Sequence, residues 1–291
     1  MSTAQLFSAC VAIWGSTWLA ITFQLGRVPP EASVFYRFLL AALLIFAWCA
    51  VRGVRMRLSA REHAWTALQG MLMFSASYLF VYYAEQHVVS GLVAVGYSAS
   101  PLLAMLGMRA FFGAPMTPPV IGGSLMGIAG ITLVFWPELA HIRGGGSAAL
   151  GAVFTAIAVV LSSMGSLVAH RNHQHGYALW PSMAWGMLYG SALSLAVTLA
   201  LGKPLTFEPT AAYVLSLIYL SVLGSIVTFA AYLTVMKRVG AARAGYIGVM
   251  TPIVALVISA FVEGFRWQVV TVAGIAVSVL GNVVILRNRA G

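Results

Sequence analysis

Long runs of apolar residues, separated by short stretches of charged residues, glycine or proline, fill the chain from beginning to end. Each run is about 20 residues long, the length that an α-helix needs to cross the hydrocarbon core of a bilayer. A helix also satisfies its own backbone polar groups, as lipid requires. The pattern predicts ten transmembrane helices, near residues 6–25, 31–51, 65–86, 91–111, 119–136, 149–170, 180–201, 213–236, 242–263 and 267–286.

Composition agrees with an all-α integral membrane protein. Hydrophobic residues make up 61% of the 291 residues and charged residues only 8%, whereas charged residues are about 25% of a typical soluble domain. A membrane barrel would alternate apolar and polar residues over segments of about ten, unlike these near-continuous runs. Cys10 and Cys49 lie inside apolar runs without a CxxC spacing, so the sequence indicates neither a disulfide framework nor a zinc site.

The net charge of +10 is distributed between the apolar runs, so it is interpreted as a topology signal rather than as a nucleic-acid surface. If the N-terminus is cytoplasmic, four of the 16 Lys and Arg residues fall outside and Arg37 falls within a span. The other eleven fall inside: Arg52, Arg55, Arg57, Arg61, Arg109, Arg171, Lys237, Arg238, Arg243, Arg287 and Arg289. Both termini of this multi-pass protein are therefore predicted to be cytoplasmic. The bacterial inner membrane is the membrane that the family resemblance described below implies.

Landmark residues recur at a single shift of 151 positions. The matched pairs are Pro30 and Pro181, Pro101 and Pro252, Gly113 and Gly264, Gly123 and Gly274, and Gly130 and Gly281. This recurrence predicts a duplication, with halves at about 1–145 and 152–291. Five spans per half make the second half enter the membrane from the opposite side, so the predicted repeat is inverted. Inverted repeats are typical of secondary transporters; duplication for stability alone is the alternative.

Several motifs resemble a known family. They are IWGSTW at 13–18, PPEASVFYRFLLAALL at 29–44, SGLVAVGYSASPLLAMLGMRAFFGAPMTPPVIGGSLMGIAGITLVF at 90–135, and GAARAGYIGVMTPIVALVISAFVEGFRWQVVTVAGIAVSVLGNVVIL at 240–286. The chain resembles the EamA-type branch of the drug/metabolite transporter superfamily, and is most similar to its aromatic amino-acid exporters. The resemblance implies a ten-helix carrier whose central cavity is lined mainly by the third, fourth, eighth and ninth spans.

Many relatives in that branch carry a Gly-Glu pair after the fourth span of each half. Here Gly113 is followed by Ala114, and in the second half Glu263 precedes Gly264 instead. Any coupling role of such a glutamate is therefore absent from the first half.

Residues that suit an amino-acid path gather in a few spans. Such a path must be mostly apolar, with a few hydrogen-bonding groups, and tyrosine offers both a ring and a hydroxyl. Ser75, Tyr78, Tyr82 and Glu85 recur at intervals of three or four, so they share one helical face. We predict a substrate-binding set of Trp18, Ser75, Tyr78, Tyr82, Tyr97, Ser98, Trp185, Tyr232 and Tyr246. For Trp18, Trp185 and Tyr232, core packing or an interfacial belt is the alternative.

Proline and buried charge add two further predictions. Pro101 and Pro252, near the middle of their spans, are predicted helix breaks, because proline removes a backbone donor and frees a carbonyl one turn back. They point to a working region between the fourth and ninth spans; a packing kink is the alternative. Arg37 within a span costs about 2.5–3.5 kcal/mol unless it is paired. It is predicted to pair with Glu85, as an outer gate or as a structural ion pair.

The preferred function is a secondary carrier that exports aromatic and other apolar amino acids by alternating access, working as a monomer. A multidrug or nucleotide-sugar carrier on the same fold is an alternative, but phosphorylated substrates call for several cations and Arg37 is the clear candidate. An intramembrane enzyme is less favoured, because the sequence contains no HExxH, GxSxG or GxxxxGK[ST] motif. No cofactor is indicated, and the chain contains no Asp, so facilitated transport is preferred to proton coupling.

Overall fold

The computed structural model describes residues 1–113, 117–140 and 147–288, and the regular elements in these ranges are helical. The side chains of some residues within helices, Pro101 and Tyr246 among them, lie outside the described set. The α-helices are α1 (Thr3–Thr22), α2 (Pro30–Val51), α3 (Ala60–Met71), α4 (Ser77–Glu85), α5 (Ser90–Gly96), α6 (Ser100–Phe112), α7 (Pro118–Ala140), α8 (Ser147–Gln174), α9 (Leu179–Ala200), α10 (Ala211–Tyr219), α11 (Thr228–Val262) and α12 (Val269–Asn288).

Three shorter elements join consecutive α-helices without a loop. The π-helical segment η1 (Leu72–Ala76) joins α3 to α4, the 3-10 turn η2 (Tyr97–Ala99) joins α5 to α6, and the π-helical segment η4 (Leu220–Val227) joins α10 to α11.

The described residues contain six helical stretches long and apolar enough to cross a membrane: Thr3–Thr22, Pro30–Val51, Ala60–Glu85, Ser147–Gln174, Leu179–Ala200 and Ala211–Tyr232. Shorter apolar helical stretches occupy Ser90–Ala99, Ile121–Val134, Met250–Val262 and Val269–Val284. These positions coincide with the apolar runs of the sequence. The protein is thus an all-α, multi-pass membrane protein, while ten spans, an inverted 5+5 arrangement and cytoplasmic termini stay predictions.

Local sequence signals explain where several helices begin and end. Ser2 and Ser59 each accept a hydrogen bond from the backbone three residues later in a capping box, which fixes the starts of α1 and α3. Pro30 occupies the first position of α2, where its missing N–H costs no hydrogen bond. Gly113 and Gly264, matched at the shift of 151, follow α6 and α11 with φ of 67° and 70°, a left-handed conformation that favours glycine.

The two π-helical segments lie at matching positions. Shifted by 151, residues 72–76 fall on 223–227, inside η4. Directly after η4, the hydroxyl of Thr228 donates to the Leu223 carbonyl at 2.5 Å, five residues back. This hydrogen bond gives a partner to a backbone carbonyl in the widened turns of η4. π-Helical turns are frequent at functional sites. Both halves therefore depart from α-helical geometry in the corresponding helix.

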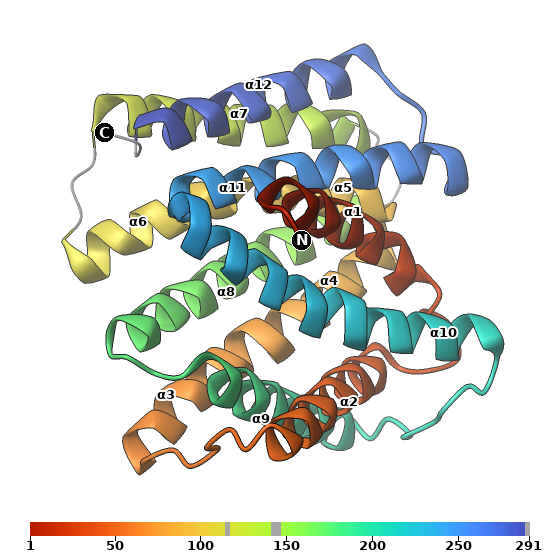
Figure 1. Ribbon diagram of the computed structural model, residues 1–291. Helices are drawn as coiled ribbons and strands as arrows, with labels where there is room; N and C mark the ends of the chain where they lie inside the picture. The colour runs from red at the N-terminus through yellow and green to blue at the C-terminus, as the bar shows by residue number, and fades with distance from the viewer. Residues whose placement is uncertain (114–116, 141–146, 289–291) are drawn as a thin grey trace.

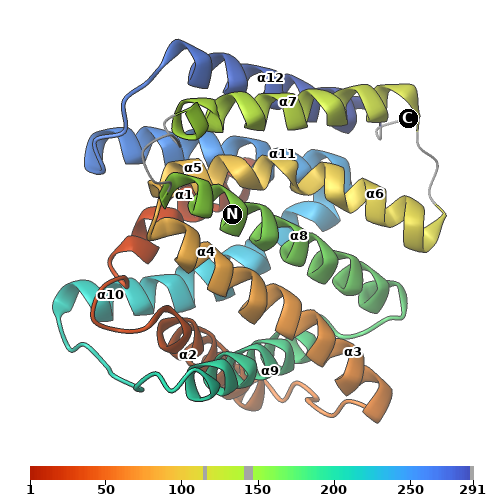
Figure 2. The same ribbon diagram turned by 180° about the vertical axis from the view of Figure 1, so that it is seen from behind.

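Helices α7 and α12 lie side by side along one edge of the bundle, and α2 and α9 lie at the opposite edge (Figures 1 and 2). A Cβ built on Gly130 would approach the Gly274 carbonyl to 2.5 Å, and one on Gly281 would meet the Gly123 carbonyl more closely still. The shift of 151 converts the first contact into the second, because it relates Gly130 to Gly281 and Gly123 to Gly274. Two equivalent units related by a two-fold axis make contacts of this form, which supports the predicted repeat.

A second pair of contacts has the same relation. The Trp14 indole N–H of α1 donates to the Gly224 carbonyl at 3.2 Å. Its counterpart at the shift of 151 joins Gly165 of α8 to Met73, where a Cβ on the glycine would lie 2.9 Å from the Met73 Cβ. In each case the first helix of one half packs on the π-helical segment of the other half.

Two features differ from the sequence expectation. Helix α11 is continuous and crosses the loop expected after residue 236, although its ribbon reverses direction so that the two expected spans form separate limbs (Figure 1). Alanine and arginine in this connection favour helical geometry, and no proline interrupts it. Pro101 does lie at a break, at the start of α6 after η2. Pro252 lies inside α11 without a break, and the Thr251 hydroxyl donates to the Ile247 carbonyl one turn back.

Candidate functional site

Aromatic side chains from both halves meet between α1, α2, η1, α4 and α11. The ring of Phe38 lies 4.9 Å from that of Tyr78 and 5.4 Å from that of Phe74, which lies 5.9 Å from Phe229. Trp14 lies 5.4 Å from Phe229 and 5.4 Å from Tyr232. We call these six residues the central aromatic cluster: Trp14, Phe38, Phe74, Tyr78, Phe229 and Tyr232. Rings at these separations stabilise one another and offer flat apolar surface.

A second aromatic contact links α1 to the interrupted helix α5–η2–α6. The rings of Trp18 and Tyr97 lie 5.0 Å apart. The Trp18 indole nitrogen is buried and has no hydrogen-bond partner among the described residues. Tyr97 interacts electrostatically with Tyr78 and Glu85, so this pair borders the central aromatic cluster. The 3-10 turn η2 thus carries a ring into the region where α1, α4 and α11 meet.

Arg37 of α2 lies against the same cluster. Its side chain is 1% exposed, and its guanidinium carbon lies 4.5 Å from the ring centre of Tyr78 and 5.1 Å from that of Phe38. Cation–π contacts of this kind become stronger where water is excluded. Gly224 of η4 borders the same region: a Cβ there would lie 2.8 Å from the Thr17 methyl group and 3.7 Å, an ordinary contact distance, from Nη2 of Arg37. The Nε and Nη1 atoms of Arg37 have no hydrogen-bond partner among the described residues.

Polar side chains surround the end of α4. The buried Tyr82 hydroxyl donates to Gln24 Oε1 at 2.5 Å. Glu85 is 8% exposed, and neither carboxylate oxygen has a hydrogen-bond partner among the described residues. Glu85 interacts electrostatically with Arg37 and Glu263. The described residues show no direct ion pair between Arg37 and Glu85, so the predicted pair is not formed in this conformation, although both charges are buried in one region.

One end of the bundle carries an ion pair between the halves. We call it the outer end, because the charge distribution predicts that it faces outward. Lys203, after α9, lies 2.9 Å from the carboxylate of Glu31 in the first turn of α2, and Tyr83 of α4 donates to the same carboxylate. Glu31 is fully buried and the Lys203 side chain is 39% exposed. The contact joins α2 and α4 to the segment after α9.

A second polar contact joins the halves at the same end. Glu263, at the end of α11, accepts hydrogen bonds from the Ser90 backbone N–H at 3.0 Å and from the Ser90 hydroxyl at 2.5 Å. The carboxylate therefore caps the start of α5 from the other half of the chain. We call the Glu31–Lys203–Tyr83 and Ser90–Glu263 contacts together the outer closure.

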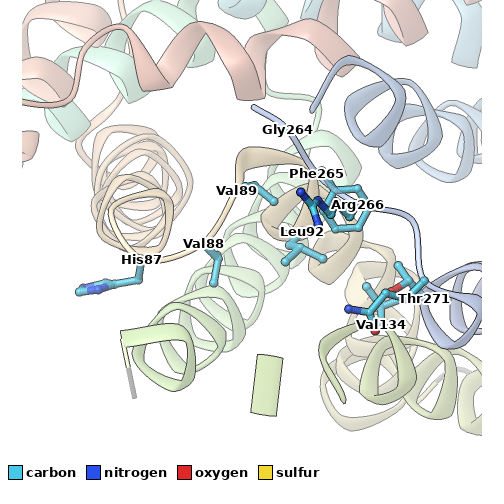
Figure 3. Close-up of a pocket in the computed structure, with 10 residues that line it drawn as sticks. His87, Val88, Val89, Leu92, Val134, Gly264, Phe265, Arg266 and Thr271 are labelled. Carbon is cyan, nitrogen blue, oxygen red and sulfur yellow. The ribbon is translucent and has the colours of Figure 1, made fainter. Parts of the chain in front are cut away.

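A cavity of about 280 Å³ lies beside the Ser90–Glu263 contact. It lies between the loop after α4 and the loop after α11, and Figure 3 shows Leu92, Phe265 and Arg266 of its lining close to one another while the His87 ring points away from them. Its lining residues are His87, Val88, Val89, Leu92, Val134, Gly264, Phe265, Arg266, Gln268 and Thr271. The cavity is slightly smaller than typical ligand pockets and is suited to a vestibule outside the closure.

Other residues of the predicted substrate set lie elsewhere. The Trp185 indole donates to the Met56 carbonyl at 2.9 Å and packs on His63 at 4.8 Å, apart from the central aromatic cluster. This face of α9 is turned toward α3, which spacing along a uniformly apolar helix does not reveal. The Ser75 hydroxyl is paired with that of Ser194 at 2.7 Å, also toward α9.

Ser98 is partly buried, and its carbonyl accepts a hydrogen bond from the Asn282 amide at 3.3 Å. This contact joins η2 to α12 through the Ser98 backbone and does not involve the Ser98 hydroxyl. The side chains of Tyr246 and Pro101 lie outside the described residues, so their predicted roles stay predictions.

Sequence reasoning missed several residues of this region. Gln24, Glu31 and Lys203 lie near span ends, where polar residues are usually solvated. One available signal was composition, because the chain contains only six acidic residues and each one near a span could have been considered for a buried contact. Phe74 and Phe229 carried no signal, since phenylalanine in a membrane helix faces lipid or protein equally well.

Replacing Lys203 by methionine should loosen the outer closure. Glu31 would stay buried without its cation; because Lys203 is partly exposed, the expected cost is about 1 kcal/mol, or roughly fivefold in a conformational equilibrium. The measurement is the labelling rate by a membrane-impermeant maleimide of a Val93→Cys probe in α5, where the native side chain is fully buried, in a background with Cys10→Ala and Cys49→Ala. Lys203→Arg, which keeps the ion pair, is the control. Equal labelling rates for the two variants would show that this ion pair does not hold the end closed.

The sequence model of the EamA-like transporter family matches residues 1–136 and 147–287. The uncharacterized inner membrane transporter YedA of Escherichia coli K12 is 28% identical over 273 residues, covering 89% of this chain and 83% of YedA. The uncharacterized transporter YoaV of Bacillus subtilis is 21% identical, covering 84% of this chain and 82% of YoaV. An uncharacterized transporter of Archaeoglobus fulgidus is 22% identical, covering 96% of each chain.

The fold is also similar to that of a solved crystal structure. The two superpose with a TM-score of 0.69 over 98% of this chain and 96% of the other, at 19% sequence identity. At this identity the likeness shows a shared fold and carries no information about substrate.

Proposed function

Because the chain belongs to the EamA-like transporter family, we propose that it exports aromatic and other apolar amino acids by alternating access through a central cavity between its two halves. The family and the names of its relatives indicate a multi-pass membrane transporter rather than an enzyme. The substrate class, the direction, the mechanism and the location in a bacterial inner membrane are our proposal.

The observation that carries the substrate class is the central aromatic cluster with Arg37 and the Trp18–Tyr97 pair beside it. Sites for small apolar molecules are lined mainly by aromatic and aliphatic groups, with a few polar groups that fix orientation. Here the rings come from both halves, and the polar groups are few and buried. This arrangement favours a ligand with an apolar or aromatic side chain and a small polar head.

The outer closure supports alternating access. Both of its contacts join the first half to the second, and partly exposed polar contacts are worth only about 1 kcal/mol each. At the shift of 151, the counterparts of Ser90 and Glu263 at the other end are Ala241 and Phe112, whose side chains cannot form such a cap. The two ends therefore differ in polar contacts. A ligand that binds one conformation modestly more tightly than the other can change which end is open.

Charge argues against a phosphorylated substrate. Among the described residues, Arg37 is the one Lys or Arg whose side chain is buried. Nucleotide sugars carry several negative charges, and these call for several cations in the site. A nucleotide-sugar carrier therefore stays the weaker proposal.

The proposal is tested with purified protein in liposomes, using labelled tryptophan, phenylalanine and a nucleotide sugar, each with and without a pH gradient. We expect saturable uptake of the two amino acids that does not require the gradient. Uptake of the nucleotide sugar alone would overturn the substrate class. Strict dependence on the gradient would overturn facilitated movement, and liposomes without protein give the background rate.

A further inference from the structure

Two oppositely charged side chains are buried in one region without forming an ion pair with each other. Arg37 is 1% exposed and Glu85 is 8% exposed. Two nitrogens of the guanidinium and both oxygens of the carboxylate have no hydrogen-bond partner among the described residues. Buried polar groups are almost always hydrogen-bonded, and each exception calls for an explanation. Charges within a membrane are costly, and they usually mark a substrate or ion pathway.

The unpartnered atoms divide into donors and acceptors. Besides the two Arg37 nitrogens, the Gln24 amide nitrogen and the Trp18 indole nitrogen are buried donors without a partner among the described residues. Gln24 is tied to Tyr82, three residues before Glu85. These donors suit the oxygens of a carboxylate, because hydrogen bonds between a charged nitrogen and a carboxylate are among the stronger ones in proteins. The Glu85 oxygens, as acceptors, suit a cation such as an ammonium group.

Aromatic rings lie next to both charges. Tyr78 and Phe38 pack on the guanidinium, while the buried ring of Tyr82 lies three residues before Glu85 on α4 and the tilted rings of Trp18 and Tyr97 lie 5.0 Å apart. A ligand that reaches both charges therefore also meets flat apolar surface. This combination of one cation, one anion and neighbouring rings is complementary to an amino acid with an apolar side chain.

We propose that Arg37 and Glu85 bind the charged head of a zwitterionic amino acid, with the α-carboxylate on Arg37 and the α-ammonium on Glu85. This inference rests on the proposed function and deepens it by assigning the head-group site. Binding adds no net charge to the buried region, because the ligand and the residue pair are each neutral overall. A ligand with only one charge leaves the opposite residue unpaired, so both charges of the ligand are required.

The test measures binding of three ligands to the full-length protein in lipid nanodiscs by tryptophan fluorescence. L-Phenylalanine carries both charges, phenethylamine lacks the carboxylate, and 3-phenylpropionate lacks the ammonium. A charge-assisted hydrogen bond lost from a buried site reduces affinity about 10- to 100-fold. We therefore expect phenylalanine to bind the wild type at least about tenfold more tightly than either analogue.

Neutral variants should change the ligand preference in opposite ways. Arg37→Gln should weaken phenylalanine about 10- to 100-fold and make phenethylamine the better ligand, because Glu85 then lacks a competing cation. Glu85→Gln should weaken phenylalanine similarly and favour 3-phenylpropionate. Arg27→Gln and Glu208→Gln, which make the same chemical changes outside the helices, should leave all three affinities at wild-type values.

A purely structural role of the two charges would lower the unfolding temperature without reversing the ligand preference. If neither neutral variant folds, Arg37→Lys keeps the charge but loses the paired hydrogen bonds, and the three-ligand comparison on the wild type still applies. Uptake of phenylalanine together with equal affinity for phenethylamine would overturn the head-group site while leaving the proposed function intact. Neither uptake nor binding of any amino acid by the wild type would overturn the proposed function itself.

Discussion

Replacing Gly70 with leucine should abolish the packing of α3 against α9 and leave little folded protein. A Cβ at Gly70 would overlap the backbone carbonyl of Gly186, and neither backbone can move away like a flexible side chain. Small residues at such crossings allow membrane helices to approach closely. Overpacking costs about 1 to 3 kcal/mol, and more where backbone must shift. The measurement is the unfolding temperature and the yield of monodisperse protein in detergent.

Gly122 provides the matched control for this prediction. It also lies within a helix, α7, but nothing lies within 4 Å of a Cβ built there. Gly122→Leu should therefore give wild-type yield and unfolding temperature, and Gly70→Ala should fall between the two leucine variants. A Gly70→Leu protein as stable as Gly122→Leu would show that α3 and α9 are not in backbone contact.

Replacing Tyr78 with alanine should lower transport efficiency about 10- to 30-fold without loss of folded protein. Its ring covers the Arg37 guanidinium at 4.5 Å and packs on Phe38 at 4.9 Å. A cation–π contact away from water is worth about 2 kcal/mol, and each 1.4 kcal/mol is about tenfold. Initial rates of phenylalanine uptake into liposomes, normalised to inserted protein, measure the effect.

Tyr78→Phe separates the ring from the hydroxyl. It keeps the surface over Arg37 and should retain most of the activity, whereas Tyr177→Ala makes the same truncation outside the central aromatic cluster and should transport like the wild type. Wild-type uptake by Tyr78→Ala would remove this residue from the proposed site.

The sequence predicted part of the candidate site because helical spacing is a local property. Ser75, Tyr78, Tyr82 and Glu85 were predicted to share one face of the third span. In the structure Tyr78 packs on Arg37 and Tyr82 donates to Gln24, whereas the Ser75 hydroxyl is paired with Ser194 toward α9. Trp185 shows the limit of this reasoning. In lipid, both faces of a helix are apolar, so spacing gave no indication that this ring packs on His63.

Contacts between distant residues required the tertiary structure. Lys203 and Glu31 are separated by 172 positions, and Ser90 and Glu263 by 173. No periodicity joins such pairs, because each contact depends on how two helices are rotated and staggered. The same holds for Arg37 and Glu85, which the sequence paired directly but which the structure buries in one region without an ion pair.

The sequence by itself determined the class of protein and the approximate positions of its helices, because transfer of an apolar run from water to lipid is a property of that run alone. It also determined the shift of 151. In the structure, this shift relates the two glycines that end α6 and α11, and it places η1 on part of η4. Only the tertiary structure determined which rings meet, which charges stay unpaired and which polar contacts join the two halves. Those features follow from close packing between helices, where small residues and side-chain shape set the approach and rotation of each pair.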